Sequence, residues 1–159
     1  MSTERILVQR SIAPQIRQAL AQTAETIFGQ NTAAPVLVAE AAVVKNKKLV
    51  EDALSKGATI LLGDANASET NPNSMRPLIV DGVTKEMDLY STESFGPTVS
   101  LIEVDSEEEA VAIANDTEYG LTSAVFTSNL FRGLRVAKQI ESGYVSFPIQ
   151  GYIYIFHPC

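Results

Sequence analysis

The chain has 159 residues, of which 45% are hydrophobic and 19% charged, and its net charge is −7. This composition is typical of a globular domain with an apolar core and argues against a disordered or fibrous chain. The twelve Lys and Arg residues are spread along the sequence, so we expect no surface for nucleic acid and none for a membrane. No apolar run approaches the roughly 20 residues that span a bilayer.

The two ends of the sequence bear on location. The N-terminus shows no positively charged lead into an apolar segment, so we expect no secretory signal. Cys159 is the only cysteine, and it has no partner for an internal disulfide. A reducing, cytoplasmic location is therefore expected. We expect Cys159 to be a free thiol rather than a nucleophile, because no base is expected beside it.

Apolar patterning predicts strands that alternate with helices. Short apolar runs predict strands at 5–9, 58–63, 76–83, 98–104, 121–127 and 144–147. Apolar residues at helical spacing predict helices at 13–28, 38–57, 105–116 and 128–143. This alternation indicates an α/β fold with a mainly parallel sheet flanked by helices. We expect one domain over residues 1–148, followed by a divergent aromatic tail over 149–159.

Several predicted helices carry signals at their ends. Pro14 is tolerated in the first turn of the first helix. Lys56 and Gly57 form a stop signal for the second helix. Asp105 is expected to cap the third helix, with Glu108 three residues later closing a capping box. Ser128 is expected to cap the fourth helix.

Two stretches carry a resemblance to a known family. Residues 93–145 match a pattern of Glu, any residue, Phe-Gly-Pro, a strand, an acidic helix, Asn-x-x-x-Tyr-Gly-Leu, a strand, and a helix ending in Gly. The opening Met-Ser-Thr-Glu-Arg and the run LVEDALSKGATILLG match further parts of the same family. On these motifs, residues 1–146 resemble the catalytic domain of the aldehyde dehydrogenase superfamily.

The resemblance implies a truncated catalytic domain. In many members the opening motif directly follows the catalytic cysteine, so this chain is expected to begin one residue after the nucleophile. The dinucleotide-binding domain, the general-base glutamate and the asparagine that donates to the oxyanion would lie upstream. The sequence departs from the family pattern after Val145. We therefore expect no bound cofactor and no NAD(P)-dependent aldehyde oxidation by residues 1–159 alone.

Few residues are candidates for chemistry. By the resemblance, Glu93 matches the family's contact to the nicotinamide ribose and Phe95 its contact beside the ring, both expected to be vestigial here. Glu93 is also a candidate catalytic acid or base, because an apolar neighbour such as Phe95 favours a protonated carboxyl. His157, the only histidine, is a second catalytic candidate, although a lone histidine in an aromatic tail is more often incidental. The spacing of His, Cys, Asp and Glu indicates no metal site.

Three functions are compatible with these observations. The first is a repurposed domain that binds a small organic molecule as substrate and promotes isomerisation, cyclisation or dehydration without redox chemistry. The second is a non-catalytic remnant or a regulatory partner. The third is an NAD(P)-dependent aldehyde dehydrogenase, which applies if the natural chain extends upstream. An uncovered apolar surface and the YIYIF run at 152–156 favour a homo-oligomer in each case.

Overall fold

A computed structural model describes residues 3–29, 32–67, 69–149 and 152–156. The chain forms two compact units, Met1–Val104 and Asp105–Cys159, and each is considered by itself. The expected division into 1–148 and 149–159 stays a prediction. No helix in these described ranges is long and apolar enough to cross a membrane.

The first unit is built on a four-stranded sheet with the order β1-β4-β3-β2. Its strands are β1 (Arg5–Gln9), β2 (Thr59–Leu62), β3 (Leu78–Asp81) and β4 (Thr98–Val104). β4 runs parallel to both β1 and β3, and only β2 is antiparallel to its neighbour. The expected α/β class with a mainly parallel sheet is confirmed.

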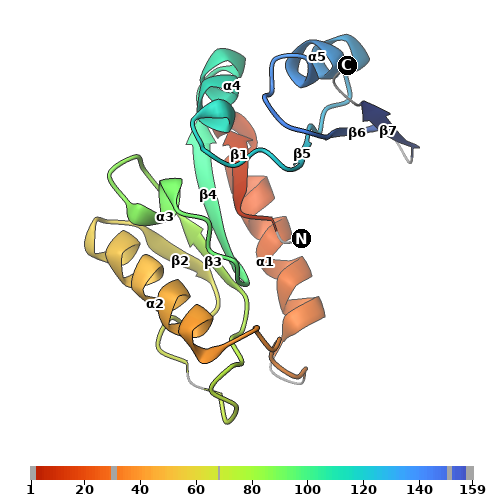
Figure 1. Ribbon diagram of the computed structural model, residues 1–159. Coiled ribbons are helices and arrows are strands. Elements are labelled where there is room, and N and C mark those ends of the chain that lie inside the picture. The colour runs from red at the N-terminus through yellow and green to blue at the C-terminus, as the bar shows by residue number, and fades with distance from the viewer. Residues whose placement is uncertain (1–2, 30–31, 68, 150–151, 157–159) are drawn as a thin grey trace. The chain divides into compact units, whose positions relative to one another are not determined.

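Helices cover both faces of this sheet (Figure 1). A 3₁₀ turn, η1 (Arg10–Ile12), leads into α1 (Ala13–Phe28), which covers one face. The other face is covered by α2 (Glu40–Ser55), which contacts the one-turn helix α3 (Asp88–Ser91). The predicted bounds of β1, α1 and β4 match the structure, and Pro14 lies in the first turn of α1 as expected. Sequence patterning missed η1 and α3.

The core on the α1 side follows from alternation along parallel strands. Val8, Ile79 and Leu101 lie on one face of β1, β3 and β4 and form a buried cluster with Ala13 at the start of α1. Leu101 pairs with Ile6 of β1 and with Asp81 of β3. Val8 and Ile79 are each two positions from those partners, and side chains two positions apart on a strand point to the same face.

Ion pairs join α1 to the ends of two strands. Arg17 donates to Asp81 at the end of β3, with Nε to Oδ2 at 2.6 Å, and its Nη2 lies 2.6 Å from Glu103 Oε1 on β4. Arg10 pairs with the other oxygen of Glu103. Hydrogen bonds to Asp81 and then to Glu103 raise the pKa of Arg17 above its ordinary value. This network fixes the orientation of α1 on the sheet.

The end of α2 confirms its predicted stop signal. Gly57 has a φ of +101°, the left-handed conformation that glycine adopts without strain. Its N–H donates to Leu54 O at 3.1 Å, and the N–H of Ala58 donates to Ala53 O at 3.0 Å. This pair of hydrogen bonds is the Schellman motif, which satisfies the last carbonyls of a helix.

The second unit contains two helices and a three-stranded sheet. Its elements are α4 (Glu107–Asn115), β5 (Ser123–Ala124), α5 (Leu130–Ala137), β6 (Val145–Ile149) and β7 (Tyr152–Phe156). β6 pairs parallel with β5 and antiparallel with β7. The run YIYIF therefore forms a strand at the end of a small sheet. The contribution of this run to a homo-oligomer stays a prediction.

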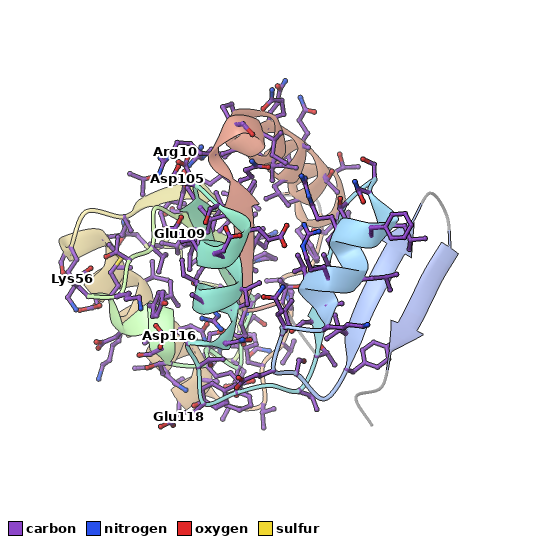
Figure 2. The ribbon with its side chains drawn as sticks, turned by 90° about the horizontal axis from the view of Figure 1, so that it is seen from above. Arg10, Lys56, Asp105, Glu109, Asp116 and Glu118 are labelled. Carbon is purple, nitrogen blue, oxygen red and sulfur yellow. The ribbon has the colours of Figure 1, made fainter. Side chains whose placement is uncertain are left out.

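Both predicted caps in this unit are wrong by one residue. Ser106, not Asp105, caps α4, and its Oγ accepts the N–H of Glu109 at 3.1 Å. Glu109 rather than Glu108 reaches back, and its Oε2 accepts the N–H of Asp105 at 2.6 Å at the start of the helix (Figure 2). The run of three glutamates places a glutamate three residues after either candidate cap, so the capping-box pattern does not identify which residue is the cap.

The second correction concerns α5. Asn129, not Ser128, caps this helix, and its Oδ1 accepts the N–H of Arg132 at 3.0 Å. Asparagine and serine are about equally favourable at this position, so the order in which they occur does not identify the cap. The helix also ends at Ala137, several residues before the predicted end at 143.

Candidate active-site loop

The loop between α3 and β4, residues 92–97, carries both family-matched residues, Glu93 and Phe95. Glu93 is half-buried, whereas the Phe95 side chain is 68% exposed. Phe95 has a φ of +52° and is the one non-glycine residue in the left-handed region within the described part of the chain. Such strained residues persist only where the surrounding structure over-determines them, and they cluster at functional sites.

Side chains from two other elements hold the backbone of this loop. Glu4, directly before β1, accepts the N–H of Ser94 on Oε2 at 3.0 Å and the N–H of Phe95 on Oε1 at 3.3 Å. Asn46 of α2 donates its Nδ2 to Ser94 O at 3.0 Å. Lys45 of α2 donates its Nζ to Glu93 O at 2.7 Å. The loop is therefore held on its amide side by β1 and on its carbonyl side by α2.

Gly96 is needed for the close approach of this loop to α2. A Cβ at this position would lie 2.4 Å from Asn46 Nδ2 and 2.6 Å from Asn46 Oδ1. Asn46 is fully buried, so its side chain has little freedom to move away. The glycine of the Phe-Gly-Pro motif thus serves packing, because only a residue without a side chain lets the buried amide reach the loop.

Lys45 is a site residue that sequence reasoning did not find. Its Nζ lies 5.4 Å from the centroid of the Phe95 ring, within the range of a cation–π contact. Lys45 is thus placed against both family-matched residues by a helix that begins more than fifty residues before them. The sequence shows only a lysine on an amphipathic helix, so no local signal would have singled it out.

A cavity of about 430 Å³, broadly open to solvent, lies between α2 and the segment that contains α3 and Thr92. This volume lies at the lower end of the range for small-molecule sites. The lining side chains are small or apolar apart from two ammonium groups, one carboxylate and one hydroxyl: Ala41, Val44, Lys45, Lys48, Leu49, Asp88 and Thr92. Two cations against one anion favour a ligand that carries negative charge.

The rim of this cavity at α3 is fixed by a short ionic network. The N–H of Asp88 donates to Asp52 Oδ2 of α2 at 2.8 Å. Lys56 Nζ lies 2.6 Å from Asp52 Oδ1. The hydrogen bond from Lys56, followed by the one from the Asp88 backbone, lowers the pKa of Asp52. The carboxylate is thus held ionised where it anchors the first turn of α3.

Comparison with known proteins gives the family. The model of the aldehyde dehydrogenase family matches residues 1–150. The chain belongs to the aldehyde dehydrogenase family. It is 35% identical to vanillin dehydrogenase of Pseudomonas fluorescens over 148 residues, 90% of this chain and 30% of that protein. It is 34% identical to the NADP⁺-dependent succinate-semialdehyde dehydrogenase 2 of Schizosaccharomyces pombe over 151 residues, 92% of this chain and 31% of that protein.

Solved aldehyde dehydrogenase structures share the fold. Succinate-semialdehyde dehydrogenase from Burkholderia pseudomallei aligns with a TM-score of 0.83 and 31% identity, over 94% of this chain and 32% of that one. The Streptococcus pyogenes succinic semialdehyde dehydrogenase, in complex with NADP⁺, aligns with a TM-score of 0.79 and 30% identity, over 93% and 33%. The chain therefore spans about a third of the length of the family members it matches.

The candidate residues from the sequence divide into two groups. The structure places Glu93 and Phe95 on one loop beside Lys45. His157 and Cys159 lie outside the described residues. The catalytic role considered for His157 and the free thiol expected at Cys159 therefore stay predictions. Within the described ranges, no group of three or more His, Cys, Asp or Glu side chains is placed to hold a metal ion.

Proposed function

We propose that this chain forms the part of an NAD(P)-dependent aldehyde dehydrogenase that faces the nicotinamide half of the cofactor. The observation that carries the proposal is the loop at 92–97. Side chains outside the loop hold it in a strained conformation beside Lys45, which also lines the adjacent cavity together with Lys48 and Asp88. Relatives described with NADP⁺ and with NAD⁺ as bound cofactor support this assignment.

The residues present fit such a cofactor. A dinucleotide combines negative charge, a ribose with hydroxyl donors and a planar ring. Lys45 and Lys48 supply positive charge at the cavity, the Glu93 carboxylate would accept from a ribose hydroxyl, and the exposed Phe95 ring offers an apolar surface to a planar group. When bound, the cofactor accepts hydride from the aldehyde carbon.

The remainder of the reaction would depend on residues that this stretch does not supply. Aldehyde oxidation in this family uses a thiolate nucleophile, and the only cysteine in the printed sequence is Cys159. We place the nucleophile outside residues 1–150. The role of this chain is then to bind and orient the cofactor, which is how a protein contributes to hydride transfer.

A second candidate is a cofactor-independent acid–base function centred on Glu93. The half-buried carboxyl lies on a rigidly held loop next to a cavity large enough for a small organic molecule. This arrangement supports binding of an intermediate for isomerisation, cyclisation or dehydration. The exposed Phe95 ring makes this the weaker candidate, because an exposed ring gives a carboxyl little shelter from solvent.

Titration of ¹⁵N-labelled protein with NADH and NADPH tests the assignment. We expect the amide signals of residues 45, 93 and 95 to shift together and to saturate with at least one of the two cofactors. Lys45→Met should weaken this binding about tenfold, the effect of losing roughly 1.4 kcal/mol from a charged contact. Lys138→Met is the matched control, because Lys138 is an exposed lysine of the other unit.

Absence of saturable shifts with both nucleotides would overturn the proposal. Saturable shifts at other residues alone would do the same. Turnover of a small-molecule substrate without any nucleotide, lost in Glu93→Gln, would establish the second candidate in its place. General acid–base catalysis is worth on the order of 10²- to 10⁴-fold, so that loss would be clear.

A further inference from the structure

Glu4 lies far from the loop in sequence and yet holds its amide side. Two oxygens of one carboxylate accept two successive amides, Oε2 from Ser94 at 3.0 Å and Oε1 from Phe95 at 3.3 Å. Glu4 is half-buried. Hydrogen bonds to an ionised acceptor are about twice as strong as those between neutral groups, so a carboxylate holds the two N–H groups more firmly than a neutral acceptor would.

The geometry of the two amides explains why a carboxylate is needed. Successive N–H groups point the same way when the backbone passes through the left-handed region, and they then form a concave site for an anion. Phe95 is in that region, with a φ of +52°. A non-glycine residue is strained in that region. The two hydrogen bonds to the Glu4 carboxylate favour this conformation of the loop.

We propose that Glu4 is a positioning residue whose carboxylate fixes the left-handed backbone at Phe95 and thereby holds Glu93 and Phe95 in place beside Lys45. Glu4 acts through the loop and does not itself touch a ligand. That Glu93 and Phe95 contact a ligand rests on the proposed function, whereas the control of the loop conformation by Glu4 does not. Lys45 and Asn46 hold only the carbonyls of Glu93 and Ser94, so they cannot replace it.

Amide hydrogen exchange offers a test that separates the side chain of Glu4 from its backbone. The backbone carbonyl of Glu4 accepts the N–H of Ser100 on β4 at 2.9 Å, a contact that no substitution of the side chain removes. In Glu4→Ala we expect exchange at Ser94 and Phe95 to become at least about tenfold faster, while exchange at Ser100 stays unchanged. In Glu4→Gln, which keeps one acceptor oxygen, we expect a smaller acceleration.

Glu51→Ala serves as the matched control, because Glu51 is an exposed carboxylate on α2. We expect it to leave exchange at Ser94, Phe95 and Ser100 unchanged. Two results would overturn the proposal. One is unchanged exchange at Ser94 and Phe95 in Glu4→Ala. The other is equal acceleration at Ser94, Phe95 and Ser100, which would mean that the substitution loosens β1 as a whole.

The same Glu4→Ala protein, titrated with NADH and NADPH, distinguishes this proposal from the proposed function. If the unmodified protein shows no nucleotide binding, the proposed function fails and the exchange result still decides the role of Glu4. If the unmodified protein binds and Glu4→Ala weakens binding about tenfold, both proposals hold. Accelerated exchange at the loop with unchanged nucleotide affinity would overturn the positioning role.

Discussion

The two compact units differ in where their large apolar side chains lie. In Met1–Val104, Leu101 is 0% exposed and is packed with residues of β1, β3 and α1. In Asp105–Cys159, Phe126 and Phe131 are each 80% exposed and Leu121 is 70% exposed. The first unit thus contains a buried apolar cluster of its own, whereas these three side chains of the second unit lie exposed among its described residues. Helix caps and side-chain hydrogen bonds stabilise the local structure of the second unit.

The two units also differ in how far apart in the sequence their polar contact partners lie. In the first unit Arg17, Asn46 and Glu4 make contacts that join residues 48 to 91 positions apart. In the second unit the longer side-chain contacts join residues 24 to 28 positions apart. Asn115 donates to Gln139 O at 2.8 Å and accepts the N–H of Glu141 at 2.9 Å, and Arg135 donates to Glu107.

The largest expected effect contrasts the two kinds of apolar residue. Leu101→Ala should lower the free energy of unfolding by roughly 2–5 kcal/mol, because it leaves a cavity in the core. Phe131→Ala should change it by no more than about 0.5 kcal/mol, because the ring is exposed. Urea denaturation followed by circular dichroism measures both. A larger loss from Phe131→Ala would show that the ring is covered in solution, and gel filtration would then test the expected homo-oligomer.

A smaller effect is expected at Gly96. Gly96→Ala should cost about 1–3 kcal/mol, because the new methyl group overlaps the buried amide of Asn46. The double variant with Asn46→Ala should recover part of this loss, since the overlapping atoms are gone. Thermal unfolding of the two single variants and the double variant gives the coupling energy. Strict additivity would mean that Asn46 is not the group that excludes a side chain at position 96.

The ion pairs of Arg17 in the first unit should contribute more to stability than the ion pair of Arg135 in the second. Arg17→Met should lower the free energy of unfolding by roughly 1–3 kcal/mol, because it removes the guanidinium that donates to two partly buried carboxylates. Arg135→Met removes an exposed pair with Glu107 and should have little effect. Comparable losses in the two variants, measured by urea denaturation, would contradict the contrast between the units.

The smallest expected effect concerns how stability changes as the pH falls into the acid range. The pKa of Asp52 is lowered chiefly by its hydrogen bond from Lys56, and that of Glu107 by its hydrogen bond from Arg135. A carboxylate with a lowered pKa adds stability above its unfolded value, 3.8 for Asp52 and 4.5 for Glu107, and this stability is lost as the pH falls through the folded value.

Asp52→Asn and Glu107→Gln should therefore flatten the acid limb of the melting temperature between about pH 5 and pH 2. Both side chains reach solvent, so the change should be modest in each. Melting curves at several pH values measure it. An acid limb as steep in each variant as in the unmodified protein would show that neither ion pair contributes to stability.

Sequence patterning predicted the elements whose signals are local. The bounds of α1 and β4 follow from apolar spacing and strand composition, and the stop of α2 follows from Lys56 and Gly57. The cap at Ser106 was predicted one residue early, because neighbouring residues carry equivalent signals. The one-turn helix α3 was missed, since four residues are too few to show a helical period.

The candidate site was predicted only as far as its contiguous motif. Glu93 and Phe95 stand in a recognisable run, so the resemblance finds them. Glu4 and Lys45 contact that run from positions 89 and 48 residues before Glu93. Glu4 belongs to the opening motif and Lys45 to an amphipathic helix, but neither local sequence indicates a contact with this run. Hydrogen bonds between a side chain and a distant backbone depend on the completed fold, which one sequence read locally does not reveal.

The side-chain attachment of the 92–97 loop has a consequence for protein engineering. Its shape depends on a carboxylate, an ammonium group and an amide that come from elsewhere in the chain. Transplanting the pentapeptide Glu-Ser-Phe-Gly-Pro into another scaffold would transfer its amino-acid sequence but not its conformation. A successful graft would have to carry Glu4, Lys45 and Asn46 with it, as a discontinuous module of eight residues rather than a portable peptide.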